Sequence, residues 1–302
     1  MKKVVHLFTP GLDSYLANYF LTKQEEEGKI ELKRVYFNLD SKYSHLELDF
    51  LRQFYSDDSG MFLDFVEVLE HLKIRELEED DAHVPNRNLL LVTLAAAKHD
   101  PDIIYINGMK DDRVSDNKKE FFEKVSEVLS MSMEKEIVVT SLFWEKEKTE
   151  AITEFIDDGG PRFDLVLKTY SCFDKIVNRE NVMLYEYNNG TFHSKPGEIP
   201  NTYNTLGTFP IYGCRACPAC YRRFCALTAA NVFIPFLDFD MTQQYKTKID
   251  ENKHPHRFTS VQSFSHFSKY YKDLQKKKIH NVDIKTTEKK TKKKENSRAG
   301  NK

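Results

Sequence analysis

The chain has 302 residues with 40% hydrophobic content, and its 45 Lys and Arg nearly balance 47 Asp and Glu, for a formal net charge of -2. This length allows one large domain or two smaller ones, and the charge balance argues against a protein that coats nucleic acid or binds membranes electrostatically. The apolar stretches are all shorter than the roughly 20 residues that span a bilayer. The N-terminal apolar run stops at Pro10-Gly11, which predicts a first strand rather than a signal peptide. We therefore expect a cytoplasmic protein with no membrane partner.

Residues 1–160 alternate short apolar runs with helical patterns. Such alternation predicts an α/β fold, a doubly wound and mostly parallel sheet with helices on both faces. The expected strands are Val4–Phe8, Leu32–Phe37, Met61–Val66, Ile103–Asn107 and Ile137–Val139. The expected helices are Ser14–Thr22, Leu46–Phe54, Arg87–Lys98, Lys118–Leu129 and Lys146–Ile156.

Residues 161–240 have a different pattern, which predicts a zinc-binding and helical region with an inserted hairpin. Val182–Tyr187 and Thr191–His193, joined by Asn188-Asn189-Gly190, predict the hairpin. The run GCRACPACYRRFCAL predicts a cysteine knuckle that leads into a helix. Residues 241–302 form a polar to basic tail, which we expect to be disordered at its end. Contact of this tail with nucleic acid is left open.

The cysteines predict a metal site rather than disulfides. Cys214, Cys217 and Cys220 form C-x2-C-x2-C, and Cys172 is the candidate fourth ligand. Four thiolates with no open position are typical of structural Zn2+, although an iron–sulfur cluster could use the same ligands. Cys225 lies inside the following helix, where a thiol usually packs as a small apolar group.

The segment after the first expected strand has the pattern of an anion site. It reads Thr9-Pro10-Gly11-Leu12-Asp13-Ser14 and leads directly into a helix. Backbone N–H groups and the helix dipole at such a start favour phosphate. Gly11 allows close approach, Ser14 adds a hydroxyl, and Asp13 is suited to cap the helix or to orient Mg2+. An ordinary capped helix after a turn is the alternative.

Several ordered motifs together resemble the 7-cyano-7-deazaguanine synthase (QueC) family of PP-loop ATP pyrophosphatases. TPGLDS at 9–14 stands where the family has S-G-G-x-D-S, and VPNRN at 84–88 resembles V-P-G-R-N. Later segments resemble G…D-C-R-x-E-F, K-x-E, S-C-Y and C-G-x-C-x-x-C-x-x-R. In that order, the segments are Gly108 with Asp116, Glu120 and Phe121 for the first motif, and Lys148-Thr149-Glu150 for K-x-E. Ser171-Cys172-Phe173 stands for S-C-Y, and CRACPACYRR stands for the cysteine motif. The resemblance covers roughly residues 1–230.

The resemblance implies an adenine nucleotide alpha hydrolase-like fold and an ATP-dependent C–N ligase or nitrile synthase. ATP would adenylate 7-carboxy-7-deazaguanine, ammonia would form the amide, and a second ATP would drive dehydration to the nitrile. Nucleic acid is not expected as a direct substrate, and a homodimer is left open. The resemblance implies catalytic roles for Asp13, Ser14 and Lys148. It implies ATP contacts from Thr9, Pro10, Gly11, Leu12, Asp13, Ser14, Arg87 and Gly108, and substrate contacts from Asp112 and Asp116.

The departures from the family pattern leave alternatives open. Pro10 has no N–H where the family has a loop glycine. The 108–121 segment is short, with Asn117 and Lys118 in place of Cys and Arg, and the family's Q-R-H survives at best as Tyr43-Ser44-His45. Such a chain could stop at the amide, or keep the zinc module without catalysis. Trp144 and the Phe121-Phe122 pair are expected in the core rather than in the site.

Overall fold

The computed structural model describes residues 1–55, 65–70, 72–79, 84–110, 112, 115–162, 164–172, 182–188, 191–197, 208–211 and 218–232. The strands are β1 (Lys2–Leu7), β2 (Ile30–Phe37), β3 (Glu67–Leu69), β4 (Ile103–Tyr105), β5 (Val138–Thr140), β6 (Val182–Asn188), β7 (Thr191–Gly197) and β8 (Thr208–Ile211). The α-helices are α1 (Leu12–Glu26), α2 (Ser44–Tyr55), α3 (Arg87–His99), α4 (Lys119–Met133), α5 (Lys148–Asp157), α6 (Asp164–Leu167) and α7 (Pro218–Ala229). Short 3-10 turns cover Arg75–Leu77 and Ser115–Asn117.

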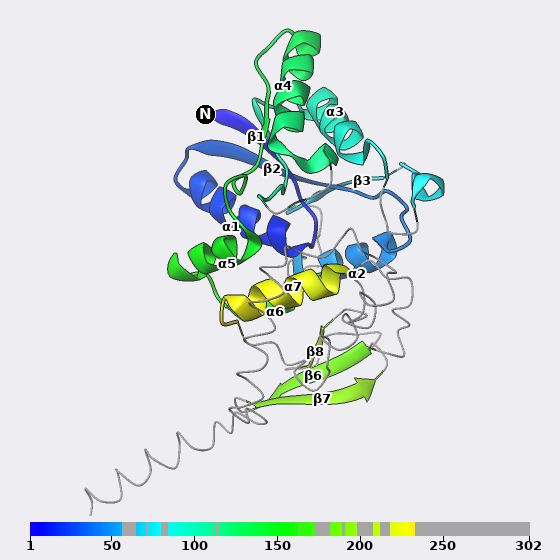
Figure 1. The fold of residues 1–302 in the computed structure, drawn as a ribbon, viewed down its shortest axis with the longest axis vertical. Helices are drawn as coiled ribbons and strands as arrows, with labels where there is room; N and C mark the ends of the chain where they lie inside the picture. The colour runs from blue at the N-terminus through cyan, green and yellow to red at the C-terminus, as the bar shows by residue number, and fades with distance from the viewer. Residues whose placement is uncertain are drawn as a thin grey trace, which may run out of the picture.

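Within these described residues, β1 to β5 form one parallel sheet in the order β3-β2-β1-β4-β5 (Figure 1). The expected α/β fold with a doubly wound parallel sheet is confirmed. β1 is the central strand, and Val4 pairs with Leu32 of β2 on one side and with Ile103 of β4 on the other. The chain reverses its direction of winding between β1 and β4. Ligands of open α/β sheets bind at the carboxyl ends of the strands beside such a switch point.

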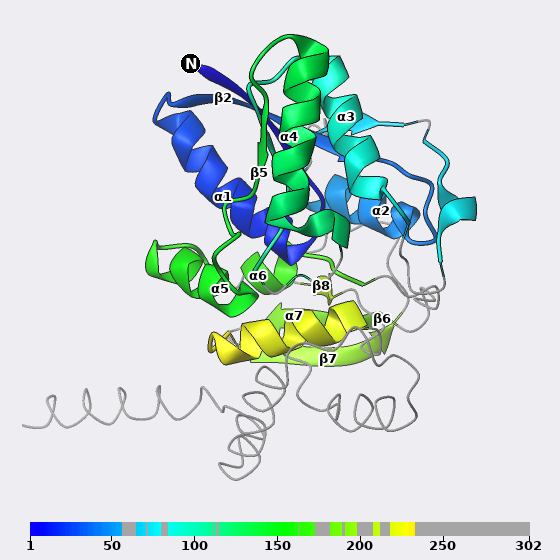
Figure 2. The ribbon, with the colours of Figure 1, turned by 45° about the horizontal axis from the view of Figure 1, so that its top comes forward.

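Alternate side chains of β1 pack against helices on opposite faces of the sheet. Val5 and Leu7 pack with α3 and α4 in one apolar cluster, which also contains the fully buried Phe122. Val4 packs with Leu21 of α1 in a cluster on the other face. Two views show α3 beside α4 and α1 beside α5 (Figures 1 and 2). Successive side chains of a strand point to opposite faces of the sheet, so the side chain of His6 lies on the same face as Val4, toward α1.

The third strand lies later than expected. The prediction of Met61–Val66 was wrong, because β3 is Glu67–Leu69 and its ladder with β2 starts where Glu67 pairs with Val35. Val66 is buried but precedes the strand, and residues 61–64 lie outside the described part. Edge strands tolerate charged residues, so their apolar signal is weak. Here the Glu67 carboxylate lies 2.9 Å from Lys33 Nζ and 3.0 Å from Lys98 Nζ.

The expected hairpin is confirmed, since β6 pairs antiparallel with β7 from Val182↔Gly197 to Asn188↔Thr191. β8, which the sequence did not predict, pairs with the other edge of β6. α7 lies across the end of the parallel sheet at which α1 begins (Figures 1 and 2). Cys214, Cys217 and the tail from 241 to 302 lie outside the described residues.

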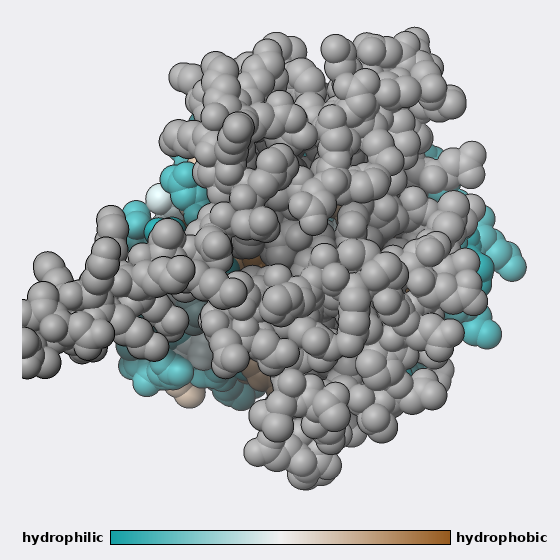
Figure 3. Space-filling view, turned by 90° about the horizontal axis from the view of Figure 1, so that it is seen from below, coloured by the Kyte–Doolittle hydropathy of each residue, from teal (hydrophilic) through white to brown (hydrophobic). Residues whose placement is uncertain are grey.

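The large apolar side chains that are exposed among the described residues are Met1, Leu77, Leu90, Val128, Met131 and Val138. Seen from below, the visible described residues are mostly hydrophilic, with small hydrophobic areas (Figure 3). Among the helices that the structure describes, none is both long and apolar enough to cross a membrane.

Candidate active site

The loop between β1 and α1 is held by its own hydroxyl groups and by residues 170–171. The Thr9 amide donates to Ser14 Oγ at 2.9 Å, and the Gly11 amide lies 3.3 Å from Thr9 Oγ1. The Tyr170 amide donates to the Pro10 carbonyl at 2.6 Å. Gly11 is the N-cap of α1 and supplies no side-chain cap, and the Leu12 amide donates a long hydrogen bond to Ser171 Oγ at 3.4 Å. The first amides of α1 are therefore directed toward this end of the sheet, where an anion would meet the positive end of the helix dipole.

A cavity of about 300 Å3 opens at the start of α1. Lys148 reaches it from the first position of α5, and its Nζ lies 2.7 Å from the Asp13 carboxylate. The side chain of Lys148 is only 13% exposed and that of Asp13 23% exposed. A lysine at a helix N-terminus opposes the helix dipole, so its position here is not explained by helix stability. It places a cation in the cavity at the start of α1.

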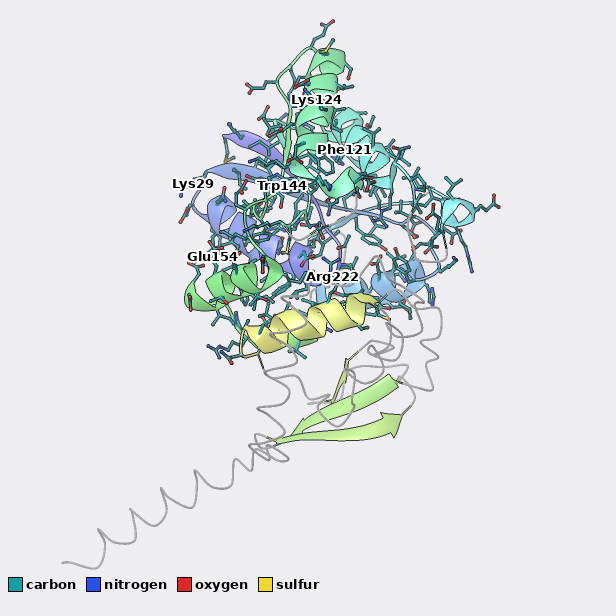
Figure 4. The ribbon with its side chains drawn as sticks, in the orientation of Figure 1. Lys29, Phe121, Lys124, Trp144, Glu154 and Arg222 are labelled. Carbon is teal, nitrogen blue, oxygen red and sulfur yellow. The ribbon has the colours of Figure 1, made fainter. Side chains whose placement is uncertain are left out.

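Arg222 of α7 lines the same cavity and forms an ion pair with Asp112, which is not among the lining residues. Arg222 Nη2 donates to Asp112 Oδ1 at 3.1 Å, while Asp112 Oδ2 accepts from the Met109 amide and from Asn117 Nδ2. Figure 4 shows Arg222 on the side of α7 that faces the parallel sheet. Desolvation raises the pKa of Asp112; Arg222 opposes this shift, and the nearby Asp13 carboxylate adds to it. The cavity is therefore lined by four cationic side chains and two carboxylates, which are Arg87, Lys148, Arg222, Arg223, Asp13 and Glu47.

A neighbouring cavity of about 290 Å3 lies beside the ends of β1 and β2 and the start of α3. Its walls combine apolar side chains with neutral amides, including Asn88 and Asn117. The residues that line both cavities are Thr9, Tyr43, Glu47, Arg87 and Asn107. Each cavity is large enough to hold a portion of a small molecule. Because the two cavities share walls, together they could hold one larger ligand or two ligands.

Arg87 reaches both cavities because α3 starts with an unusual backbone. Asn86, the N-cap of α3, has φ 58° and ψ 15°, which is the left-handed region. Glycine adopts this region freely, and asparagine adopts it more readily than most other residues. Asn86 stands at the glycine of V-P-G-R-N, so the substitution preserves the turn that presents Arg87.

Glu47 is a site residue that the sequence did not indicate. It lies on α2, lines both cavities, and accepts a hydrogen bond from Tyr36 Oη at 2.8 Å. Desolvation raises the pKa of this carboxyl to about 7, against the lowering effects of Tyr36 and Arg87. In the sequence Glu47 is one of several acidic residues in an amphipathic helix. Only the structure, which brings it near Arg87, marks it as a site residue.

Glu47→Gln should remove a pH-dependent loss of stability. Because the folded pKa of about 7 is above the ordinary value of 4.5, stability is full below pH 4.5 and is lost as pH rises through about 7. The shift corresponds to roughly 3 kcal/mol. Urea unfolding at pH 4.5 and pH 8 should show this loss in the parent protein but not in Glu47→Gln. Glu31→Gln, at an exposed position of β2, is the control. An equal loss in parent and Glu47→Gln would contradict the assignment.

Other residues singled out from the sequence occupy structural positions. A Cβ on Gly108 would lie 2.1 Å from the Trp144 ring, so this glycine makes room for the indole, and it lines neither cavity. The Asp116 side chain is buried near the Asn88 amide and supports the start of α3. His45 is exposed and lines neither cavity. Trp144 and Phe121-Phe122 pack in the α3–α4 cluster, as expected for core residues.

Two of the four predicted metal ligands are among the described residues and lie in one cluster. Cys172 is 2% exposed and packs with Phe50 and Tyr170, and Cys220 of α7 packs against the same cluster. The buried Arg223 Nη2 donates to the carbonyls of Leu165 and Val166, while its Nε finds no acceptor in the described part of the chain. Both thiols favour the charged form of Arg223, so the guanidinium lies near them. No group of three or more metal-binding side chains is found among the described residues.

A family model described as "Queuosine biosynthesis protein QueC" matches residues 15–181, more than half of the 302 residues. The match includes Arg87, Lys148 and Cys172, begins just after the 9–14 loop, and ends before Cys214. Comparison with curated proteins gave no match.

Among solved structures, the crystal structure of a predicted subunit of tRNA methyltransferase from Methanocaldococcus jannaschii is similar at 13% sequence identity. That likeness covers 56% of this chain and 94% of the other, with a TM-score of 0.28, which carries no inference about function. The family match, by contrast, covers enough of the chain to assign it. The protein belongs to the QueC family of ATP-using, ligase-like enzymes, which take part in queuosine and 7-deazaguanine biosynthesis.

Proposed function

We propose that the protein converts 7-carboxy-7-deazaguanine to 7-cyano-7-deazaguanine at the expense of ATP. The observation that carries this proposal is the convergence of Lys148, Asp13 and Arg222 on the start of α1 within one cavity. Both reactants are anionic before they react, and the cavity offers four cationic side chains and helix amides to bind them. The family assignment supports the use of ATP.

Each step places charge where these groups can stabilise it. A substrate carboxylate oxygen attacks the α-phosphorus of ATP, and pyrophosphate leaves. Ammonia then attacks the acyl carbon and AMP leaves, which gives the amide. The amide oxygen then attacks the α-phosphorus of a second ATP and pyrophosphate leaves, and loss of that oxygen with AMP and of two N–H protons gives the nitrile. The α1 amides, Ser14 and Lys148 would stabilise the charge that develops on the phosphates, and Arg87 or Arg222 would orient the substrate carboxylate.

The metals are assigned by the chemistry of the donors. Asp13 and Asp112 provide the hard carboxylate oxygens that Mg2+ prefers, and Mg2+ would supply neutralisation of phosphate charge when bound. Cys172 and Cys220, with Cys214 and Cys217, would hold Zn2+ as a structural site. The buried Arg223 Nε supports this, since a thiolate would give that donor an acceptor.

An amide-forming ligase is the alternative that Pro10 and the short 108–121 segment favour. Pro10 lacks the backbone N–H that would donate to a phosphate. This loss would slow activation of the amide, the more demanding step, more than it slows adenylation of the carboxylate. The experiment that separates the two is incubation of the full chain with ATP, Mg2+, ammonia and 7-carboxy-7-deazaguanine, followed by mass analysis. A nitrile product supports the proposal, and an amide that accumulates supports the alternative. No AMP and no product would reject both.

Pro10→Gly should tighten ATP binding, because it returns one N–H to the loop. A hydrogen bond to a charged group is worth roughly 1.5–3 kcal/mol, or about tenfold or more in affinity. Added backbone freedom should cost on the order of 1 kcal/mol in stability. Calorimetric titration with ATP measures the first effect and urea unfolding the second. Pro161→Gly, at an exposed position remote from the loop, is the matched control. An unchanged ATP affinity in Pro10→Gly would mean that phosphate is not held by the loop amides.

A further inference from the structure

His6 lies buried on β1 directly behind the phosphate loop. The ring is fully buried, packs edge-on against Phe8, and lines neither cavity. Its Nε2 lies 2.9 Å from Asn107 Oδ1 and 3.5 Å from Ser14 Oγ. An imidazole nitrogen in this position either donates a proton or accepts one, depending on the tautomer. The tautomer therefore decides which way the Ser14 hydroxyl can point.

Asn107 settles which tautomer is present. Its Nδ2 donates to the Leu7 carbonyl at 2.9 Å, and a carbonyl can only accept, so the amide nitrogen must face Leu7. Asn107 Oδ1 consequently faces His6, and because an amide oxygen also only accepts, His6 Nε2 must carry the proton. His6 Nδ1 has no partner in the described part of the chain, as expected for an unprotonated nitrogen.

The surroundings of His6 also keep it neutral. Burial lowers the pKa of His6 to about 4, against the raising effect of its hydrogen bond with Asn107, and the Arg34 guanidinium of β2 lowers it further. Arg34 is itself paired with Glu25 of α1 at 2.9 Å. At neutral pH the ring therefore has one proton, and that proton is committed to Asn107.

This arrangement fixes the polarity of Ser14. Ser14 Oγ already accepts the Thr9 amide, and a protonated Nε2 offers no lone pair to the hydroxyl proton. We infer that His6 and Asn107 are positioning residues, which hold the Ser14 hydroxyl as a donor toward an anion bound at the start of α1. With the other tautomer, Ser14 would donate to His6 and turn a lone pair toward the phosphate. The inference rests on the proposed function, which places ATP phosphate at this loop.

The tautomer can be measured without ATP. Nitrogen-15 spectra of the full chain labelled at histidine should show one resonance set that is absent from His6→Gln. That set should report a neutral ring with protonated Nε2, and it should not titrate between about pH 6 and 8. A protonated Nδ1, or a ring that titrates in this range, would overturn the inference.

A double-mutant cycle tests whether His6 acts through Ser14. Ser14→Ala should weaken ATP binding about tenfold, and His6→Leu should weaken it severalfold because the hydroxyl is no longer oriented. In the Ser14→Ala background, His6→Leu should cause no further loss. Equal losses in both backgrounds would mean that His6 is only structural. His45→Leu, at an exposed histidine, should change nothing.

Failure of the proposed function can be distinguished from failure of the inference about His6. If the parent protein does not bind ATP, the proposed function fails, while the tautomer is still decided by its spectrum. If His6→Leu does not fold, as judged by its unfolding transition, the nitrogen spectra of the parent decide the inference alone.

Discussion

Full-length protein purified without chelator should contain about one zinc ion per chain, and Cys172→Ser should lose it. The structure supports a shared site for Cys172 and Cys220, because the chain brings them into one buried cluster from positions 172 and 220. The buried guanidinium of Arg223 beside them favours thiolates over thiols. Cys225→Ser should keep its zinc, since Cys225 is expected to pack in α7 rather than to bind metal.

Loss of the metal should have a large effect on stability. Structural zinc contributes roughly 10–16 kcal/mol in zinc-finger peptides, whereas whole domains are stable by only about 5–15 kcal/mol. Even a third of the peptide value should lower the unfolding temperature by about 10 °C or more. Elemental analysis and thermal unfolding with and without a strong chelator make the measurement. Iron with visible absorption would indicate a cluster instead, and a chain without metal would refute the site.

The parallel sheet could be predicted from the sequence because its central strands are buried on both faces. β1, β2 and β4 are apolar runs separated by helical patterns, and their buried residues Val4, Val35 and Ile104 confirm the expectation. At the edge of the sheet the strands are short, so their hydrophobic pattern is too brief to locate them. β3 has three partly buried residues, one of them Glu67, so its position could not be read from hydrophobicity.

The candidate site was predicted only where local motifs report it. The 9–14 loop, Arg87 and Lys148 were found by motif, and the structure places all of them except Pro10 at the two cavities. Asp112 was expected as a substrate contact, but its ion pair with Arg222, 110 positions away, leaves no signal in the sequence. His6 and Glu47 were missed for a related reason. A histidine in a strand and a glutamate in a helix look ordinary until their neighbours are known.

Lys148→Met should lower kcat/KM for ATP at least about 100-fold. Two effects combine: the phosphate loses a nearby cation, and the Asp13 carboxylate loses the partner that lies 2.7 Å away. The first is worth roughly 1.5–3 kcal/mol, and the unpaired carboxylate then repels the phosphate, so a total near 3 kcal/mol is a modest expectation. Initial rates of pyrophosphate release measure it.

Lys146→Met is the matched control, because Lys146 lies two positions earlier and pairs with Glu154 in a more exposed setting. Its pair should contribute at most about 1 kcal/mol to stability, so kcat/KM should stay within about threefold of the parent. Lys148→Arg keeps the charge but not the compact ammonium group, and it should retain part of the activity. If Lys148→Met and Lys146→Met turn over alike, the cation at the start of α5 does not contact phosphate. The Lys148–Asp13 pair would then only join α5 to α1, and a lysine at that helix start would have to be explained by packing alone.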